Sequence, residues 1–284
     1  SDTDFAKSAF DLINSKRSLK LESIKESTVS RKPKAPFTTD TMLQTSSSTL
    51  GWSIAKTSKI ASTLYQSGHI TYIRTDSTRT NANARDDIRK YIESNFGQDF
   101  LGDGVGESGK SKDNVQDAHE AIRPTNPSAE VAGEDRDEKA LYRLIWSRFA
   151  SSQMSNSIRE RRSLSFSCDG LDIPLNGAST WRIHSGWEEV FSWLYKDVQT
   201  QPPKIGFNAG SLWAIDEDAI LTIDFTKPPR RFTESSIIQQ MKKDGIGRPS
   251  TYVSTVSKLV DRKYVEKDSS SLIPTSEGRT LWVE

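Results

Sequence analysis

The sequence predicts a mixed α+β protein of more than one domain. Its 284 residues are enough for about two domains with packed cores. Apolar residues recur at helical spacing in some segments and alternate along others, and Gly/Pro-rich turns separate the two kinds. The spacing changes to alternation near residue 158 and returns to helical near residue 228. This change predicts a β-rich module between two helical parts.

The first third of the chain predicts a helix, a strand and a second helix. Residues 1–14 have helical spacing, residues 18–31 alternate, and the prolines of 32–36 mark a linker. Residues 38–50 are polar and predict no regular element, with a methionine and a leucine as core anchors. A helix is expected over 53–66, because Gly68 follows its last apolar residues.

Residues 68–80 read GHITYIRTDSTRT and carry the first candidate chemistry. We expect His69–Ile73 to form a short strand and residues 74–80 to form the polar loop that follows it. Asn81 is a suitable cap for a helix whose apolar face runs from Ala84 to Phe96. Catalytic groups often lie on such loops between rigid elements.

Tyr72 is the candidate nucleophile of this stretch. A tyrosine with a nearby arginine, here Arg74, suits attack on a phosphodiester. The same residues also fit one face of a half-buried strand, where tyrosine is common. Residue types alone leave both interpretations open.

Two further polar segments follow. Residues 104–111 meet the literal GxxxxGKS spacing of a phosphate-binding loop, but they neither follow an apolar strand nor open a helix, so a surface loop is the alternative. Residues 117–125 read DAHEAIRPT. Their His119, Glu120 and Arg123 could orient a phosphate or a nucleophile, and a solvated turn before Pro124 is the alternative. A helix is then expected over 137–151.

The last part of the chain predicts a nucleic-acid-binding motif. After alternating segments with turns at 176–177 and 208–210, Thr233 is a candidate cap for a helix. A glycine turn, a second helix and a short hairpin at 263–273 follow, which is the order of a winged helix-turn-helix. Ser250 and Thr251, beside Arg248, precede the second helix and are placed to hold a phosphate.

Composition limits the class of protein. Residues 15–36 carry seven basic and two acidic side chains, residues 228–267 carry nine and four, and residues 99–138 carry four and eleven. Basic segments on both sides of an acidic one suit a polyanion-binding surface. The single cysteine, Cys168, excludes an intramolecular disulfide. No apolar run approaches the roughly 20 residues of a membrane span and no signal peptide is present, so we expect a cytoplasmic, nucleoid-associated protein.

Three motifs together carry a family resemblance. GHITYIRTDST, DAHEAIRPT and FTKPPRRFTESSIIQQMKKDGIGRPSTYVSTVSKLVDRKYV resemble, in this order, the type IA DNA topoisomerases, most closely bacterial topoisomerase I. Supporting matches are APFTTDTM at 35–42, LYRLIWSRF at 141–149 and GW at 186–187. The resemblance spans roughly residue 33 to the C-terminus.

The resemblance implies a role for each matching residue. Tyr72 would form a 5′-phosphotyrosine with single-stranded DNA, and Arg74 would stabilise the charge developing on the phosphate. His119 and Arg123 would lie near the tyrosine and the cleaved strand. The remaining matches would support the pocket (Asp76 and Ser77) or bind the substrate backbone (Arg248, Ser250 and Thr251).

The resemblance also implies a fold and a departure from it. We expect an open toroidal core in which residues 1–34 and 155–227 form a β-rich arch, 35–154 the tyrosine-bearing helical domain, and 228–284 part of a winged-helix-like base. The family's Toprim domain, whose carboxylates hold Mg²⁺, has no match here, and neither do its C-terminal zinc modules. We therefore expect a monomeric fragment without its own metal that binds single-stranded DNA weakly and is inactive alone, whereas the intact enzyme would relax negatively supercoiled DNA with Mg²⁺.

Other functions remain as alternatives. A non-catalytic winged-helix nucleic-acid-binding protein would use Tyr72 only as a strand residue. A tyrosine recombinase or relaxase would need clustered arginines or histidines, whereas the three histidines stand far apart in the sequence. A nucleotide hydrolase would depend on Lys110 of the glycine-rich segment.

Overall fold

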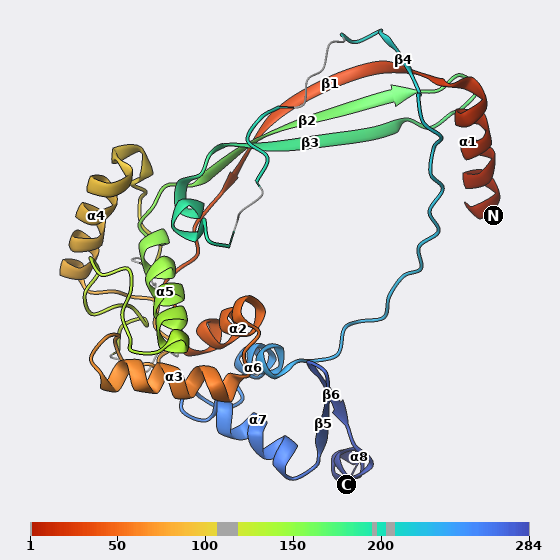
Figure 1. Ribbon diagram of the computed structural model, residues 1–284. Coiled ribbons are helices and arrows are strands. Elements are labelled where there is room, and N and C mark those ends of the chain that lie inside the picture. The colour runs from red at the N-terminus through yellow and green to blue at the C-terminus, as the bar shows by residue number, and fades with distance from the viewer. Residues whose placement is uncertain (1, 107–118, 195–197, 203–207, 284) are drawn as a thin grey trace. The chain divides into compact units, whose positions relative to one another are not determined.

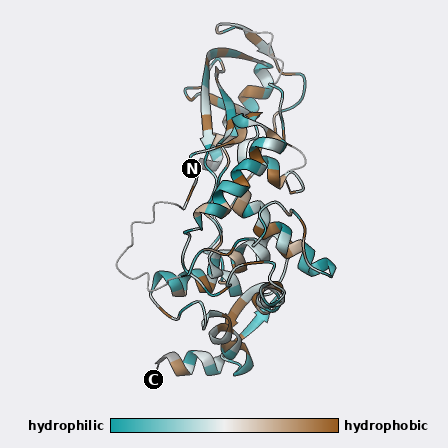
Figure 2. Ribbon diagram, turned by 90° about the vertical axis from the view of Figure 1, so that its left-hand side faces the viewer, coloured by the Kyte–Doolittle hydropathy of each residue, from teal (hydrophilic) through white to brown (hydrophobic). Residues whose placement is uncertain are grey.

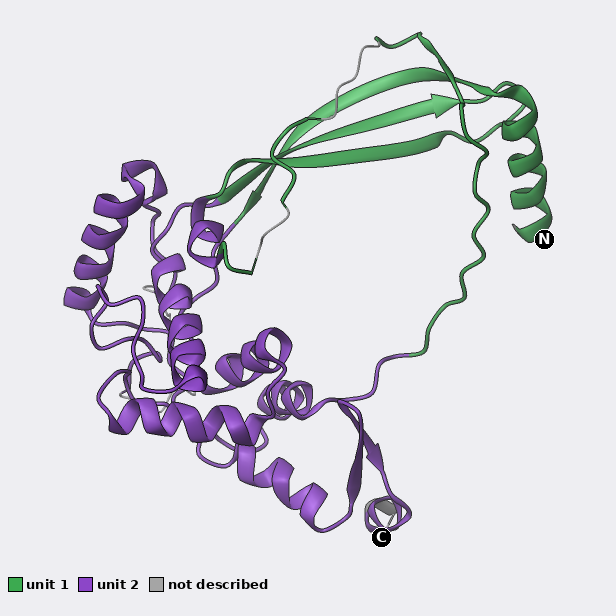
Figure 3. Cartoon of the chain, in the orientation of Figure 1, with its two compact units in different colours: residues 1–31, 157–185, 192–228 green, residues 32–156, 186–191, 229–284 purple. Residues whose placement is uncertain are grey.

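The computed structural model describes residues 2–106, 119–194, 198–202 and 208–283 (Figure 1). The chain divides into two compact units, drawn in different colours in Figure 3. One comprises residues 1–31, 157–185 and 192–228, and the other comprises 32–156, 186–191 and 229–284. Helices and strands both occur, which confirms the mixed α and β class. The predicted division into arch, tyrosine domain and base stays a prediction.

The first unit contains a four-stranded antiparallel sheet with the order β3-β2-β1-β4, preceded by a helix. Strands β1 to β3 are long and lie side by side in a curved ribbon (Figure 1). Leu21 and Trp181 are buried, and the rings of Phe166 and Trp213 meet edge-on at 5.2 Å. The elements are α1 (Asp2–Lys16), β1 (Ser18–Arg31), β2 (Ser157–Ser167), β3 (Leu175–His184) and β4 (Leu212–Ala214).

Two sequence predictions in this unit are wrong. The turn expected at Asn176–Gly177 lies inside β3, where Asn176 pairs with Ser165 of β2. The 11-residue β2 continues the pairing past the Asn-Gly step, and this tertiary context overrides the local turn preference. Residues 212–223 also alternate and predict strand over their whole length, but only the three residues of β4 pair, and residues 215–223 leave the sheet.

The second unit is mainly helical and is built around one buried helix. In α5 (Arg136–Ser151), nine side chains are buried. Most of the apolar side chains among them are fully buried. Other helices of the unit each carry both polar and apolar residues, as the mixed colours in Figure 2 show. They are α2 (Thr39–Leu50), α3 (Ile54–Gln66), α4 (Ala82–Phe96), η1 (Gln98–Phe100) and η2 (Gly186–Phe191).

Helix α2 was missed by the sequence analysis. Thr38 begins it with a capping box, in which the Thr38 backbone N–H donates to the Thr41 hydroxyl at 2.9 Å. Met42 and Leu43 are buried, as expected of core anchors. The rest of the helix is largely Thr, Ser and Gln, so its apolar period is too weak to be recognised.

The C-terminal part of this unit has the predicted order of helix, glycine turn, helix and hairpin. Thr233 caps the first helix as predicted, accepting from the Ser236 N–H at 3.1 Å. Residues of both helices join the buried cluster that contains Leu43 and Ile54. The elements are α6 (Glu234–Lys243), α7 (Tyr252–Asp261), β5 (Val265–Asp268), β6 (Ser271–Pro274) and α8 (Ser276–Val283).

Among the described residues, no helix combines the length and the apolar character that crossing a membrane requires.

Candidate active site

The segment that carries Tyr72 connects α3 to α4 and is held from both sides. After α3 the chain turns at Gly68, whose φ of 75° favours glycine. On one side the Thr71 N–H donates to the Arg123 carbonyl at 2.9 Å. On the other side the Thr39 hydroxyl donates to the Ile73 carbonyl at 2.7 Å and accepts from the Thr75 N–H at 2.9 Å.

The predicted strand at His69–Ile73 is therefore wrong. The segment makes one isolated antiparallel bridge, between Ile70 and Pro124, and is otherwise irregular. Proline has no N–H, so the residue opposite Ile70 cannot extend a ladder. Backbone hydrogen bonds to Leu64, Arg123 and Thr125 hold the segment, together with the side chains of Thr39 and Thr71.

The segment 119–125 is irregular and is fixed by the same threonine. Thr71 Oγ1 donates to the Ala121 carbonyl at 2.7 Å and accepts from the Arg123 N–H at 2.9 Å. The Ala121 N–H in turn donates to the Arg79 carbonyl at 2.7 Å. The segment therefore lies between residue 71, next to Tyr72, and residue 79.

Tyr72 lines a cavity of about 600 Å³, called here the tyrosine pocket. His119, predicted to lie near the tyrosine, is brought beside it with ring centroids 4.8 Å apart. Tyr65 of α3 meets Tyr72 edge-on at 5.4 Å. The pocket is lined by Tyr65, Thr71, Tyr72, Arg79, Thr80, Asn81, His119 and Glu120.

Arg123 lies behind this pocket and is only 8 % exposed. Its Nε and Nη2 donate to the two carboxylate oxygens of Glu120 at 2.9 and 2.8 Å, and its Nη1 donates to the Pro124 carbonyl at 2.9 Å. Glu120 also accepts from the Asn81 N–H at 2.9 Å. Glu120 thus ties the His119 segment to the start of α4, and Arg123 holds Glu120 in place, a role that residue types alone did not reveal.

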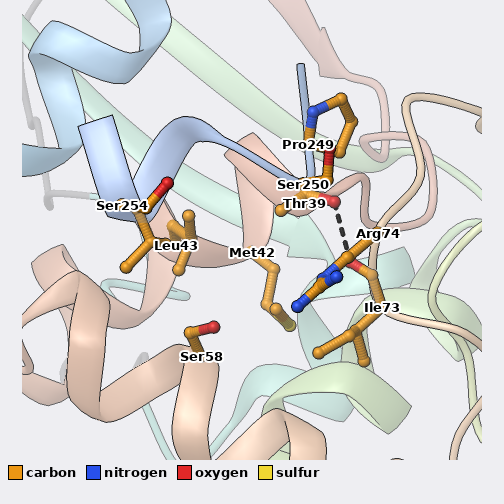
Figure 4. Close-up of a pocket in the computed structure, with 10 residues that line it drawn as sticks. Thr39, Met42, Leu43, Ser58, Ile73, Arg74, Pro249, Ser250 and Ser254 are labelled. Atoms are coloured by element: carbon orange, nitrogen blue, oxygen red, sulfur yellow. Dashed lines mark hydrogen bonds between the residues drawn. The ribbon is translucent and has the colours of Figure 1, made fainter. Parts of the chain in front are cut away.

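Arg74 lines a second cavity, of about 230 Å³, called here the arginine pocket (Figure 4). The side chain is exposed, and Ser250 and Pro249, which precede α7, line the same space. The neighbouring Thr251 hydroxyl accepts from the Arg248 N–H at 2.9 Å, and the Arg248 guanidinium donates to the Gly247 carbonyl at 2.7 Å. The structure thus brings Arg74 together with Ser250 from the glycine-turn motif.

Tyr72 and Arg74 line different pockets. The arginine that shares a pocket with Tyr72 is Arg79. Sequence reasoning named Arg74 and passed over Arg79 and Tyr65. Arg79 stands seven residues after Tyr72 and Tyr65 seven residues before it, and neither spacing signals proximity outside a regular helix.

The two remaining predicted site residues shape the loop after Arg74. The Ser77 side chain is buried, and its Oγ accepts from the Arg79 N–H at 3.2 Å. Asp76 Oδ1 lies 3.6 Å from Lys242 Nζ, which donates to Asp40 at 2.7 Å. Burial, together with the charges of Asp76 and Asp40, raises the pKa of the nearby Tyr252 phenol to about 12.

The described carboxylates near the two pockets are paired with basic side chains. Among the described residues, no three His, Cys, Asp or Glu side chains are grouped as metal ligands. Glu120, the carboxylate in the tyrosine pocket, is engaged by Arg123, and Asp76 and Asp40 share Lys242. The expectation that Mg²⁺ is held by a domain outside this chain stays a prediction. The segment containing Lys110, which meets the spacing of a phosphate loop and has a surface loop as its alternative, lies largely outside the described residues.

Comparison with known proteins assigns the chain to a protein family. The sequence profile of the DNA topoisomerase family matches residues 1–283, so the chain belongs to this family. The resemblance that three motifs carried is confirmed.

Individual relatives are bacterial DNA topoisomerases 1. The chain is 36% identical to that of Fervidobacterium islandicum over 94% of its own length and 40% of the relative's. It is 37% identical to that of Escherichia coli (strain K12), over 88% of its length and 29% of the relative's. The solved structure of full-length topoisomerase I from Thermotoga maritima superposes with a TM-score of 0.79 at 34% identity, covering 95% of this chain and 45% of that one. The chain thus spans less than half the length of these relatives.

Proposed function

We propose that this chain is the part of a type IA DNA topoisomerase that supplies the strand-cleaving tyrosine, Tyr72. The observation that carries the proposal is the position of Tyr72. It lines an open pocket together with a histidine and an arginine, on a segment fixed by threonine hydrogen bonds. A preorganised nucleophile of this kind needs little rearrangement on binding a strand.

The reaction proposed is a reversible transfer of one phosphodiester. The Tyr72 oxygen attacks the phosphorus of a single DNA strand and loses its proton. The bond from phosphorus to the 3′ oxygen breaks, and that oxygen leaves as a hydroxyl after taking up a proton. A 5′-phosphotyrosine link replaces the broken ester, so the hydroxyl can later reverse the step without ATP.

The surrounding residues suit the charge of this reaction. Arg79 lines the tyrosine pocket, and Arg74, two residues after Tyr72, lines the arginine pocket. Cations held at such a centre stabilise the negative charge that develops on the phosphate. Ser250, Thr251 and Arg248 then bind the strand's backbone where it passes α7.

In the intact protein this step would allow passage of a second strand and relaxation of negatively supercoiled DNA. The chain alone lacks a carboxylate set for Mg²⁺ among its described residues, so we propose that it binds single-stranded DNA weakly, as a monomer, and does not cleave it.

The test uses the intact protein and the chain alone. Tyr72→Phe in the intact protein should abolish relaxation and the covalent protein–DNA adduct. Tyr91→Phe, at a tyrosine that lines neither pocket, should preserve both. Full relaxation by Tyr72→Phe would reject the nucleophile. An adduct formed by the 284-residue chain with Mg²⁺ and a suicide oligonucleotide would reject its catalytic incompleteness.

A second candidate function is a non-catalytic winged-helix nucleic-acid-binding protein. The observation that favours it is the order of α6, the glycine turn, α7 and the β5–β6 hairpin. This function predicts that Tyr72→Phe leaves every DNA-dependent activity unchanged, so the same experiment separates the two.

A further inference from the structure

The direction of the Arg74 side chain depends on the backbone that carries it. The side chain is exposed, and within the described part of the chain it makes no hydrogen bond, ion pair or ring contact. Its two neighbours are different, because Ile73 is 7 % exposed and Thr75 is fully buried. An arginine side chain without partners has many rotamers, so the fold can direct it only through its Cα–Cβ bond. The contacts that hold residues 73 and 75 therefore set the direction of Arg74.

Thr39 holds the backbone on both sides of Arg74. Its hydroxyl donates to the Ile73 carbonyl at 2.7 Å, the bond drawn as a dashed line in Figure 4, and accepts from the Thr75 N–H at 2.9 Å. Its backbone N–H donates to the Thr75 carbonyl at 2.9 Å. A single residue thus provides hydrogen bonds that a neighbouring strand would otherwise provide to residues 73–75.

Thr39 is itself fixed in place. It is the first residue of α2, follows the Thr38 cap and is 6 % exposed. The next residue, Asp40, is 2 % exposed and accepts from Lys242 of α6 at 2.7 Å. The first turn of α2 is therefore anchored to the helix-turn-helix part. Because the Thr39 side chain is buried, losing its hydroxyl would leave its partners without a replacement from water.

We infer that Thr39 is a positioning residue for strand cleavage, which directs Arg74 to the phosphate that Tyr72 attacks. This inference rests on the proposed function and adds to it the residue that fixes Arg74. Without the hydroxyl, the Thr75 N–H loses its acceptor and the Ile73 carbonyl loses a donor, so the backbone that carries Arg74 shifts. The hydroxyl hydrogen of Thr39 is already donated within the protein, so the affinity for DNA should not depend on it.

The first experiment compares Thr39→Val with Thr39→Ser in the intact protein. Valine has nearly the shape of threonine but no hydroxyl, and serine keeps the hydroxyl. We expect Thr39→Val to lower the rate of strand cleavage at saturating DNA by about 10- to 100-fold, the size of effect that a shift of about 1 Å near a reacting centre produces. The DNA concentration that gives half-maximal cleavage should stay unchanged, and Thr39→Ser should retain most of the rate. Thr39→Ala is a second variant without the hydroxyl, for which we expect the same loss.

Thr57→Val is the matched control. Thr57 is fully buried in α3, its hydroxyl donates to the Ser53 carbonyl at 3.1 Å, and it lines neither pocket. This variant also loses one buried hydroxyl, and urea unfolding measures the loss of stability in both valine variants. The cleavage rate of Thr57→Val should match that of the unsubstituted protein. Equal losses of cleavage rate in the two variants would show that Thr39 contributes only to stability and would overturn the inference.

A double variant identifies the residue through which Thr39 acts. If Thr39 acts by directing Arg74, then Thr39→Val combined with Arg74→Ala should cleave no more slowly than Arg74→Ala alone. Losses that multiply would show that Thr39 acts through another residue, and they would overturn the assignment of Arg74 as its target.

Tyr72→Phe, measured beside these variants, separates this inference from the proposed function. If Tyr72→Phe still forms the covalent protein–DNA adduct, the proposed function is wrong and the inference is wrong with it. If Tyr72→Phe forms no adduct but Thr39→Val cleaves at the rate of the unsubstituted protein, only the inference is wrong. Loss of the adduct in Tyr72→Phe, together with slow cleavage by Thr39→Val and its recovery in Thr39→Ser, is the result we expect.

Discussion

Lys242 of α6 donates a 2.7 Å hydrogen bond to Asp40 of α2, and this pair joins the helix-turn-helix part to α2. Asp40 is 2 % exposed and also accepts from the Thr38 hydroxyl at 2.7 Å. Asp76, two residues after Arg74, lies 3.6 Å from the same ammonium group. One cation therefore serves two carboxylates, one of them fully buried.

Removing this cation should destabilise the unit. Lys242→Met leaves Asp40 buried without its partner, which costs about 3 to 5 kcal/mol for a fully buried pair. The Lys242 side chain is 36% exposed and the Thr38 hydroxyl remains, so we expect about 2 kcal/mol. Urea unfolding of the two variants Lys242→Met and Lys243→Met measures the difference. Lys243 is the matched control, because it is the exposed neighbour on the same helix.

The double variant tests the cause of that loss. Asp40→Asn combined with Lys242→Met removes both charges, so it should be more stable than Lys242→Met alone. If the two losses simply add, the pair does not interact and the account above is wrong.

Arg123 should act through Glu120 and not through the DNA. Its three hydrogen bonds to Glu120 and Pro124 occupy the guanidinium within the protein. We expect Arg123→Gln and Glu120→Gln each to lower strand cleavage by the intact protein by one to two orders of magnitude, since misplacement of about 1 Å near a reacting centre has effects of that size. Cleavage rates at saturating DNA provide the measurement.

The combined variant separates the two roles of Arg123. If it acts only by holding Glu120, then Arg123→Gln with Glu120→Gln should be no slower than either single variant. Multiplying losses, together with a lower salt slope for Arg123→Gln, would instead show direct contact between Arg123 and the DNA.

The sequence predicted those elements whose signal is local. Helix α4 was predicted from Asn81 and from a regular apolar stripe. The Asn81 side chain caps the helix by accepting from the backbone N–H groups of Asn83 and Ala84. The turn before α7 is marked by Gly245 and Gly247, both with positive φ. The order of the three motifs along the chain then identified the family. This order is read from the sequence alone and does not depend on tertiary contacts.

The site itself depends on contacts that no local pattern encodes. The tyrosine segment looked like a strand, but its hydrogen bonds go to Thr39 and to residues 121–125. Arg123 was predicted to lie near the cleaved strand; the structure pairs it with Glu120, and its contact with DNA stays a prediction. These outcomes depend on which polar side chains meet after folding, and residue types alone cannot decide between partners in the protein and partners in the substrate.

Gly186 should tolerate no side chain. Its φ is 49°, and a Cβ there would lie 2.2 Å from the Asn156 carbonyl oxygen. The next residue donates its N–H to the Ser155 carbonyl at 2.9 Å, so the two backbones cannot separate without losing this bond. We expect Gly186→Ala to lower the free energy of unfolding by more than about 2 kcal/mol.

The control for this prediction is Gly177→Ala. Gly177 lies in β3 with open space around its Cβ position, so alanine there should be neutral or slightly stabilising. Thermal unfolding of both variants is the measurement. Equal losses would mean that the close approach at Gly186 is relieved by movement of residues 155–156.

Buried tyrosines should make the chain sensitive to alkali. Burial raises the pKa of Tyr142 to about 12, above the value of about 10 expected in the unfolded chain. The folded state therefore holds this proton more tightly. Its contribution to stability is complete below about pH 10 and is lost as the pH rises towards 12. At pH 11 the loss is about 1.4 kcal/mol for this one group.

Tyr142→Phe isolates this effect. The Tyr142 hydroxyl donates to the Ala129 carbonyl at 2.8 Å, so its removal should lower stability by about 1 kcal/mol at pH 7. The phenylalanine variant has no proton to lose at this position, so its stability should decline less between pH 10 and pH 12. Urea unfolding at pH 7, 10 and 11 should show the two proteins converging near pH 11. Parallel curves over this range would mean that Tyr142 ionises equally in the folded and unfolded states and that its burial exerts no such effect.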